Sequence, residues 1–559
     1  MTWFDAVTRF LLPASMDDGE QFDYPFVASD VALFHLTVHG ERGALDAHTW
    51  DDMLLPQYSA QLARGVSILG QQELHRRLQA LPAVGVGVDV DGDIGIDADA
   101  DADASSGADS GAGVGLALAT DIHIGVEASA ARVRTLVADA GQRQHLLAAC
   151  AGLRRADREV SETLFGPELA AAPRWTRYLP WLPVAFLLSA ALALVSGWLP
   201  LWGVVLALWL SLSLVQMRFH EAAAEWARIL NTLQQMLRAQ SLLAALDHPL
   251  ALAFRDDAAL AGKINRRISR SPLSRLPGAS EYADWLWLQN IRHYFISRDV
   301  VRDHLATLRA SFARVAALEA DLALARHLAA TPRYCWAEQG EGVALAGAVH
   351  PLLAEPAPLS FTLARQGAFI SGQNGIGKST LLRTVGLNLI VARAFGFSYA
   401  DAAVTPALPV YSSMQNEDAL DGGESLYIAE LRRAREMLAL AARGPAIFII
   451  DEIFRGTNHL ESISAAAAVL HSLSASGRVI VSSHNLVLAP LLADVLAPWC
   501  VGRVDGHLRL APGVLKETNG IALLAARGFD ATISANANRV HAWLSDYMAH
   551  PVECEALLL

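Results

Sequence analysis

Three short apolar runs in the second half of the chain are each followed by polar residues. Residues 367–371 read Gly-Ala-Phe-Ile-Ser, residues 446–450 read Ala-Ile-Phe-Ile-Ile, and residues 478–482 form the third run. Continuous apolar runs of this length are typical of strands that are buried on both faces of a parallel sheet. Residues 380–394 carry apolar side chains at helical spacing. The pattern therefore predicts an α/β domain with a sheet rich in parallel strands.

The remainder of the chain is dominated by helical periodicity. Residues 220–246 and 300–328 have long amphipathic patterns rich in Ala and Leu. Immediately before the first of these patterns, residues 178–217 contain no charged side chain. One membrane-spanning helix needs about 20 apolar residues, so this stretch has room for two. The turn formers Gly-Trp-Leu-Pro at 197–200 interrupt it near its centre.

We therefore expect a transmembrane hairpin, with helices over about 181–197 and 201–217. Tyr and Trp side chains stand near the ends of both helices, where aromatic belts form. Arg174 and Arg177 precede the hairpin and Arg218 follows it, which predicts that both ends face the cytoplasm. The alternative is a buried helical hairpin of a soluble core, although soluble helices usually carry a polar face.

The apolar hairpin and its flanking arginines also predict where the protein is located in the cell. We expect it in a bacterial-type cytoplasmic membrane, with the α/β domain on the cytoplasmic side. Residues 1–13 lack the basic start and the long apolar stretch of a cleaved signal. Four scattered cysteines without metal or redox spacing agree with a reducing compartment.

Length and net charge limit the number of domains and the class of binding partner. The 559 residues leave room for two or three domains, and 44 basic against 57 acidic residues give a formal charge of −13. An acidic balance is not the signature of a nucleic-acid-binding protein. Part of the charge lies in residues 84–115, an Asp/Ala/Gly tract that predicts a disordered insertion. Calcium binding by this tract is the alternative, but the EF-hand spacing and its distal glutamate are missing.

The loop after the first apolar run has the pattern G-x-x-x-x-G-K-[ST]. Such a loop, between a strand and a helix, directs backbone N–H groups at a phosphate, and its glycines let the backbone close around the anion. Lys378 is expected to reach the β- and γ-phosphates, and the Ser379 hydroxyl to bind Mg²⁺. The predicted nucleotide-binding residues are Gly372, Gln373, Asn374, Gly375, Ile376, Gly377, Lys378, Ser379 and Thr380.

The other two runs end in further candidates for ATP chemistry. Asp451 and Glu452 follow the second run, where a parallel sheet carries its ligand sites. Asp451 is expected to bind the Mg²⁺ ion, and Glu452 to orient or deprotonate the attacking water. His484 follows the third run and is placed to sense the γ-phosphate. The alternatives are a solvated strand end for the acidic pair and an ordinary loop histidine for His484. With Lys378, these residues form the predicted catalytic group.

These motifs together resemble the ATPase domain of the MutS family, which belongs to the ABC-type ATPases and is best known for DNA mismatch repair. The resemblance rests on four segments: residues 372–380, Asp-Ala-Leu-Asp-Gly-Gly-Glu-Ser-Leu-Tyr-Ile-Ala-Glu at 418–430, Asp-Glu-Ile-Phe-Arg-Gly-Thr-Asn at 451–458, and Ser-Ser-His-Asn at 482–485. Flanking matches at 349–353 and 518–528 extend it. It covers roughly residues 345–545. It implies a P-loop ATPase that uses ATP and Mg²⁺.

The resemblance also implies a homodimer with composite sites. In that family two ATPase domains pair, and a signature segment of one meets the γ-phosphate held by the other. Gly423 and Ser425 would serve the partner's nucleotide in this way, at the start of a helix. Glu424 and Leu426 depart from the Arg and Thr that the family usually has there, which puts the hydrolysis rate in doubt. The alternative is that Ser425 only caps a helix.

Outside the ATPase domain, the helical regions are similar to the MutS core and lever. The Phe-x-Glu motif of mismatch-reading members does not occur before the core-like stretch. DNA therefore remains possible by family only. A basic cluster at 263–270 suits DNA phosphates, anionic lipid headgroups or plain solvation. The expected division of the chain is an N-terminal segment with the start of the helical core (1–83), the acidic insertion (84–115), helical core (116–177), the transmembrane hairpin (178–217), helical core and lever (218–335), the ATPase domain (345–545) and a tail (546–559).

Three functions are compatible with these features. The first, which we favour, is a membrane-anchored MutS-like ATPase whose cycle moves helical levers. The second is an ATP-dependent DNA-binding repair protein. The third is a membrane scaffold that nucleotide stabilises as a dimer, with little turnover.

Overall fold

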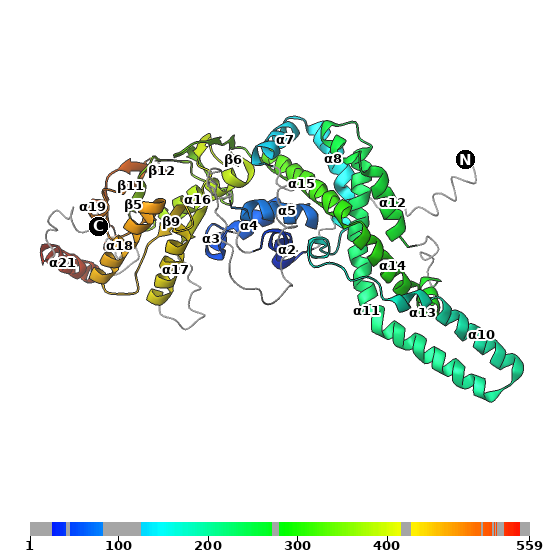
Figure 1. Cartoon of the computed structure of the whole chain (residues 1–559). Coiled ribbons are helices and arrows are strands. Elements are labelled where there is room, and N and C mark those ends of the chain that lie inside the picture. Colours follow the sequence, from blue (N-terminus) through cyan, green and yellow to red (C-terminus); the bar gives the residue numbers. More distant parts are fainter. Residues whose placement is uncertain are drawn as a thin grey trace, which may run out of the picture. The chain divides into compact units, whose positions relative to one another are not determined.

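The computed structural model describes residues 25–40, 45–81, 125–270, 279–414, 426–504, 507–516, 519, 521 and 530–547 (Figure 1). The chain divides into two compact units. We call residues 1–38, 62–76 and 135–326 the helical unit, and residues 39–61, 77–134 and 327–559 the α/β unit. The acidic tract at 84–115 lies outside the described residues. The predicted combination of an α/β domain containing parallel strands with a helical region is confirmed.

The main sheet of the α/β unit has six strands within the described residues, in the order β12-β11-β5-β10-β9-β8. Its strands from β11 to β8 are parallel to one another, and β12 is antiparallel to β11. The strands are β5 (Gly367–Gly372), β8 (Val410–Ser413), β9 (Ile447–Asp451), β10 (Arg478–Ser482), β11 (Leu496–Val504) and β12 (His507–Pro512). The three apolar runs of the sequence are the central strands β5, β10 and β9.

Helices cover both faces of this sheet. They are α16 (Lys378–Phe395), α17 (Leu426–Ala441), α18 (His459–Ser476) and α19 (Leu488–Leu491). Phe448 of β9 belongs to a buried cluster with side chains of α17 and α18. The next residue, Ile449, points the opposite way, and a Cβ added at Gly386 of α16 would lie 2.9 Å from its Cδ1 atom. The α16 helix, which carries the phosphate loop at its start, therefore packs against the other face.

Two smaller sheets accompany the main sheet and were not expected from the sequence. One has the order β2-β7-β3-β4 and the other pairs β1 with β6. The strands are β1 (Cys335–Trp336), β2 (Glu338–Gln339), β3 (Val343–Ala348), β4 (Leu359–Leu363), β6 (Phe397–Ser398) and β7 (Ala402–Thr405). They are short, and β4 alternates between buried and exposed positions because only one face is covered.

An N-terminal segment is attached to the edge of the main sheet. It comprises α3 (Ala47–Asp52) and α4 (Leu55–Leu62). The Asp52 carboxylate accepts hydrogen bonds of 2.8 Å from the Ser412 hydroxyl and from the backbone N–H of Met414. The Thr49 hydroxyl accepts a bond of 2.7 Å from the N–H of Ser412. Residues 39–61 therefore belong to the α/β unit, whereas the sequence pattern grouped them with the helical core.

The helical unit is built around two long helices. They are α11 (Leu199–Ala244) and α15 (Leu305–Ala330). Other helices of this unit are α2 (Ala28–His39), α5 (Ile68–Gln79), α8 (Ala140–Cys150), η2 (Ala151–Arg155), α9 (Ser161–Phe165), η4 (Pro249–Phe254), α12 (Ala258–Ile268), α13 (Ala279–Trp287) and α14 (Gln289–Asp303). Helix α7 (Val126–Ala138) has residues in both units. Helix α21 (Ala531–Tyr547) belongs to the α/β unit and ends the described chain. The Trp226 indole N–H donates to the Ser297 hydroxyl at 2.8 Å and thereby ties α11 to α14.

The first part of α11 forms a hairpin with α10 (Trp181–Ser196), which the short helix η3 (Arg174–Tyr178) precedes (Figure 1). Gly197 ends α10 in the left-handed conformation (φ 64°), and Pro200 stands in the first turn of α11. The second helix does not end near 217 but continues to Ala244. The segments Arg174–Ser196 and Leu199–Ala244 are long and apolar enough to cross a membrane by length and composition, and only 17% of each apolar window is buried.

Candidate active site

The phosphate loop joins β5 to α16, as the sequence predicts for such a motif. Gly375 and Gly377 have positive φ angles of 73° and 109°, a conformation that side chains strongly disfavour. Gly377 is the residue before the helix, and its carbonyl accepts the N–H of Leu381 at 2.9 Å. The two glycines therefore let the backbone wrap around the start of α16, where free N–H groups and the helix dipole favour an anion.

Lys378 is the first residue of α16, and its side chain is folded back into the loop. Its Nζ atom donates to the carbonyls of Gly372 at 3.0 Å and Gln373 at 3.4 Å. Burial lowers the pKa of Lys378, which the negative charges of Glu452 and Asp451 oppose. An ammonium group in this position can bind phosphate oxygens at the mouth of the loop.

Asp451 and Glu452 stand at the end of β9 beside the phosphate loop. Asp451 is buried, and its carboxylate accepts a hydrogen bond from the hydroxyl of Ser482, its partner in the register of β9 with β10. Glu452 leaves the strand in the left-handed conformation, with φ 61°, and Phe454 repeats it with φ 56°. Non-glycine residues in this region carry strain of order 1–3 kcal/mol each, and such strain is common at functional sites.

The Glu452 carboxylate is held between two basic side chains. Its Oε2 atom pairs with Nε of Arg455, and its Oε1 atom lies 3.0 Å from Nε2 of His484. Burial alone would raise the pKa of Glu452, but hydrogen bonding to His484 and the charges of Arg455, His484 and Lys378 outweigh it and lower the pKa. Glu452 is therefore ionised at neutral pH and can accept a proton.

His484 also lies 3.3 Å from Nζ of Lys378, through the same Nε2 atom. One ring nitrogen cannot donate to a carboxylate and accept from an ammonium at once. The shorter contact, with Glu452, fixes Nε2 as the donor in this arrangement. The His484 imidazole thus lies between Lys378 of the phosphate loop and the candidate base, Glu452.

An open pocket of about 250 Å³ lies beside these groups. Its lining comes from the loop after β9, the start of α18 and the segment after β10. The lining residues are Glu452, Ile453, Arg455, Thr457, His459, Ser462, Ser483, His484 and Asn485. The polar side chains of this pocket are suited to hold a phosphate group and a water molecule near Glu452.

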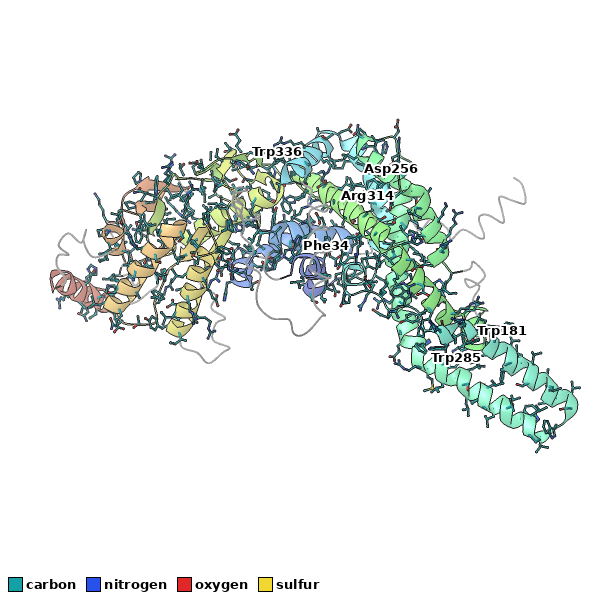
Figure 2. All side chains as sticks on the ribbon, in the orientation of Figure 1. Phe34, Trp181, Asp256, Trp285, Arg314 and Trp336 are labelled. Carbon is teal, nitrogen blue, oxygen red and sulfur yellow. The ribbon has the colours of Figure 1, made fainter. Side chains whose placement is uncertain are left out.

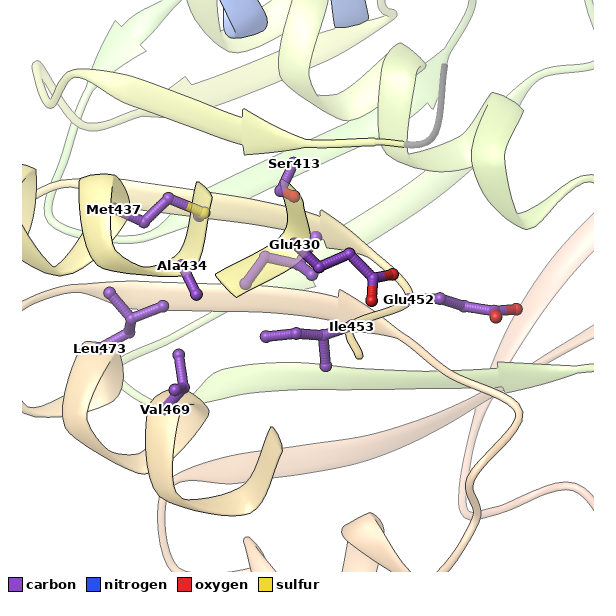
Figure 3. Close-up of a pocket in the computed structure, with 9 residues that line it drawn as sticks. Ser413, Glu430, Ala434, Met437, Glu452, Ile453, Val469 and Leu473 are labelled. Atoms are coloured by element: carbon purple, nitrogen blue, oxygen red, sulfur yellow. The ribbon is translucent and has the colours of Figure 1, made fainter. Parts of the chain in front are cut away.

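A second contact links the site to α17. The Glu430 carboxylate accepts the backbone N–H of Arg455 at 2.9 Å, and a Cβ added at Gly456 would lie 2.6 Å from the backbone nitrogen of Tyr427. Glu430 and Glu452 line a cavity of about 20 Å³ whose other walls are mainly apolar (Figure 3). In this view the Glu452 carboxylate points away from the apolar side chains. The loop after β9 is thus held directly against the first turns of α17.

Asn519 binds the phosphate loop from the C-terminal part of the chain. Its side-chain oxygen accepts the backbone N–H of Asn374 at 3.0 Å, and its side-chain nitrogen donates to the Asn374 carbonyl at 3.4 Å. The N–H of Asn374 is one of the groups that the motif assigns to phosphate binding.

The structure brings Lys378, Glu452 and His484 into contact and places Asp451 beside them on adjacent strands. Ser379 and Thr380 stand in the first turn of α16, and among the described residues no hydrogen bond joins Ser379 to Asp451. Gly423 and Ser425 lie outside the described residues, immediately before α17.

Four further residues of the site had no role assigned from the sequence. They are Arg455, which pairs with Glu452; Glu430, which binds the loop after β9; Ser482, which binds Asp451; and Asn519, which binds the phosphate loop. All four lie in segments that carry the family resemblance, so the sequence marked their neighbourhood without assigning their roles. Those roles depend on strand pairing, backbone turns and tertiary contacts.

Comparison with known proteins agrees with this geometry. Residues 368–497 match MutS domain V. Residues 368–497 therefore share this domain with proteins of the MutS family. Endonuclease MutS2 of Thermus thermophilus is 35% identical over 183 residues, which are 32% of this chain and 23% of that protein. DNA mismatch repair protein MutS of Thermus aquaticus is 26% identical over 209 residues, 35% of this chain and 26% of that protein. DNA mismatch repair protein MutS of Geobacillus kaustophilus is 28% identical over 191 residues, 32% of this chain and 21% of that protein.

The chain thus spans about a quarter of the length of these MutS relatives. The matched domain contains the phosphate loop, the acidic pair and His484, so the similarity is concentrated in the candidate active site.

Proposed function

We propose that this chain is a membrane-anchored MutS-family ATPase that hydrolyses ATP and couples the reaction to movement of its helical unit. The observation that carries the proposal is the contact of Glu452 with His484, and of His484 with Lys378, at the end of a phosphate loop. An ionised carboxylate, a lysine and an anion-binding helix start are the parts that ATP hydrolysis needs.

The chemistry can be assigned to named groups. The N–H groups of residues 375–379 and the Lys378 ammonium hold the β- and γ-phosphates, whereas the N–H of Asn374 is bonded to Asn519. Glu452 accepts a proton from the water that attacks the γ-phosphorus, and the bond from that phosphorus to the β–γ bridging oxygen breaks. His484 donates to Glu452 and keeps the carboxylate oriented. Contact between His484 and a γ-phosphate would reorient this pair and report that ATP is bound.

Magnesium fits the same site. Ser379 offers a hydroxyl in the first turn of α16, and Asp451 offers a buried carboxylate that the Ser482 hydroxyl holds in place. Oxygen ligands of this kind, few in number and completed by phosphates and water, suit Mg²⁺. The ion would supply charge neutralisation to the β- and γ-phosphates.

We further propose a homodimer in which Gly423 and Ser425 of one copy complete the nucleotide site of the other. The contact of α17 with the loop after β9 supports this assignment, because α17 directly follows the segment that contains both residues. Binding of a partner's phosphate at that segment would be transmitted to Glu452 through Glu430 and Arg455. Two-fold symmetry is the simplest closed arrangement.

The proposed anchor is the hairpin of α10 and the first part of α11, in a bacterial-type cytoplasmic membrane with the ATPase domain on the cytoplasmic side. Its apolar side chains are exposed: Leu188 is 66% and Leu194 71% accessible. This exposure favours lipid contact over the alternative of a soluble core hairpin. Arg174, Arg177 and Arg218 at its base favour the cytoplasmic orientation.

The proposal is tested by measuring ATP turnover of the full chain, purified in detergent, with and without duplex DNA. A second function, ATP-dependent DNA repair, is favoured by the names of the relatives, which include DNA mismatch repair proteins. Salt-sensitive binding of mismatched duplex that changes the ATPase rate would support this second function. Turnover that is independent of DNA supports the membrane ATPase, and absence of turnover under all conditions would leave only a nucleotide-dependent scaffold.

The acid limb of the pH–rate profile depends on Arg455. Because the charge of Arg455 helps to lower the pKa of Glu452, an Arg455→Gln substitution raises that pKa. Glu452 then becomes protonated at a higher pH, and activity on the acid side is expected to fall at higher pH than in the unmodified chain. The measurement is kcat as a function of pH from about 3.5 to 8, a range that includes the ordinary glutamate pKa of about 4.3. Arg435→Gln, which changes an exposed arginine of α17, is the matched control. An unmoved acid limb in Arg455→Gln would show that Glu452 does not set it.

A further inference from the structure

Exposed aromatic side chains gather at the base of the hairpin, where it joins the rest of the helical unit. They come from three segments: η3, the start of α10, and α13. Their exposed fractions range from 42% to 67%, far above those of core residues. Figure 2 shows two of them, Trp181 and Trp285, in this region. We call the set the collar, and its members are Trp175, Tyr178, Trp181, Trp285 and Trp287.

The collar is fixed to the hairpin by a buried apolar cluster. Leu288, which follows Trp287, is fully buried with Leu179 of the segment before α10 and Leu212 of α11. The Trp175 ring lies 5.8 Å from that of Phe219 and 5.7 Å from that of Phe295. The aromatic rings are therefore held at a defined level of the hairpin by packing on one side, while their other side is open to the surroundings.

Basic residues accompany the collar. Arg174 and Arg177 on η3 and Arg218 on α11 are exposed. Within the described residues none of the three forms an ion pair, whereas Asp284 of α13 pairs with Arg270 at 3.2 Å. The base of the hairpin thus combines amphipathic rings with three exposed arginines that form no ion pair among the described residues.

The length of the hairpin agrees with the distance between the two membrane–water interfaces of a bilayer. Trp198 and Trp202 are exposed at the tip. From Trp181 to Trp198 a helix rises about 25 Å at 1.5 Å per residue, close to the hydrocarbon thickness of about 30 Å. Aromatic rings accumulate at the two interfaces of a membrane and not in its centre. The collar and the tip therefore stand at the spacing of the two interfaces.

We propose that the collar is a binding surface for anionic phospholipid headgroups, with η3 and α13 lying in the headgroup layer on the cytoplasmic side. The inference rests on the proposed membrane insertion of the hairpin and adds the surface and the lipid class that position it. Indole and phenol rings suit a layer that is apolar on one side and wet on the other, and the arginines bind lipid phosphates.

The test is a depth measurement on the full chain. With its native cysteines replaced by alanine, the chain is spin-labelled in turn at Trp285→Cys, Trp287→Cys, Leu188→Cys and Leu252→Cys, and is reconstituted in vesicles of phosphatidylcholine with phosphatidylglycerol. Collision with oxygen relative to a water-soluble nickel chelate reports depth. The label at 188 is expected in the hydrocarbon and the label at 252, an exposed position on η4, in water. Those at 285 and 287 are expected between them, about 5–10 Å into the boundary layer.

The outcomes separate this inference from the proposal on which it rests. Labels at 285 and 287 that behave like that at 252, with the label at 188 in hydrocarbon, overturn the collar and leave the anchor intact. A label at 188 that behaves like that at 252 overturns the membrane anchor itself. Photo-activatable headgroup lipids added to the unmodified chain give an independent reading, with cross-links expected at 174–178 and 283–287. Cross-links confined to other segments contradict the inference even if the labelled variants misfold.

The preference for anionic lipid has its own control. The label at 285 should move toward the membrane when phosphatidylglycerol is added to phosphatidylcholine vesicles. The Arg174→Gln/Arg177→Gln variant should lose this shift, and Arg255→Gln, an exposed arginine of the same unit, should keep it. An equal depth in both lipid compositions contradicts the assignment to anionic headgroups.

Discussion

Replacing Glu452 by glutamine is expected to lower the maximal rate of ATP hydrolysis by about 100- to 1,000-fold, with ATP binding retained. Glutamine has the shape of glutamate but cannot accept a proton from water at neutral pH. The substitution also removes the negative charge that raises the pKa of Lys378, so the ammonium loses part of its support. Steady-state turnover and equilibrium binding of a labelled ATP analogue, measured on the same preparation, separate the two effects.

Glu338→Gln is the matched control for this variant, because Glu338 is an exposed glutamate on β2 of the same unit. Its turnover should equal that of the unmodified chain. If Glu452→Gln turned over ATP at the unmodified rate, the carboxylate would not be the base, and the site would serve to hold nucleotide only. Loss of both binding and turnover would instead indicate that Glu452 supports the phosphate loop through Lys378.

The central part of the fold could be predicted because it is locally encoded. The strands β5, β9 and β10 are continuous apolar runs, and the phosphate loop has glycines where positive φ angles are needed. The small sheets could not be found in the same way. Strand β3 pairs with β4 and with β7, and these strands are four to six residues long, so their stability depends on partners elsewhere in the sequence.

The site itself was only partly encoded in its motifs. Glu452 and His484 stand at the ends of predictable strands, and parallel pairing brings such ends together. The contact of Arg455 with Glu452 depends on two left-handed residues, Glu452 and Phe454, which no pattern of apolar positions reveals. The continuity of α11 past residue 217 was also hidden, because the change from apolar to charged residues marks a change of environment and not the end of a helix.

Placing one arginine in the middle of each hairpin helix is expected to remove the chain from membranes. Leu188 and Leu206 stand near the centres of the two apolar segments and are 66% and 55% exposed. An arginine in the middle of a spanning helix costs about 2.5–3.5 kcal/mol, and two such costs together correspond to at least about a thousandfold shift from the inserted state. The Leu188→Arg/Leu206→Arg variant should move from the membrane pellet to the supernatant, or be degraded, when expressed and fractionated with alkaline carbonate.

Leu242→Arg is the control, because Leu242 lies on the same helix α11, has the same 55% exposure, and stands beyond the apolar segment. In water an arginine at any of these three exposed positions should be tolerated, since its charge remains solvated. The double variant and the control therefore behave alike if the hairpin is part of a soluble protein, and they differ only if lipid surrounds residues 188 and 206. Retention of the double variant in the membrane pellet would contradict the anchor, because the surroundings of both leucines would then have to be polar.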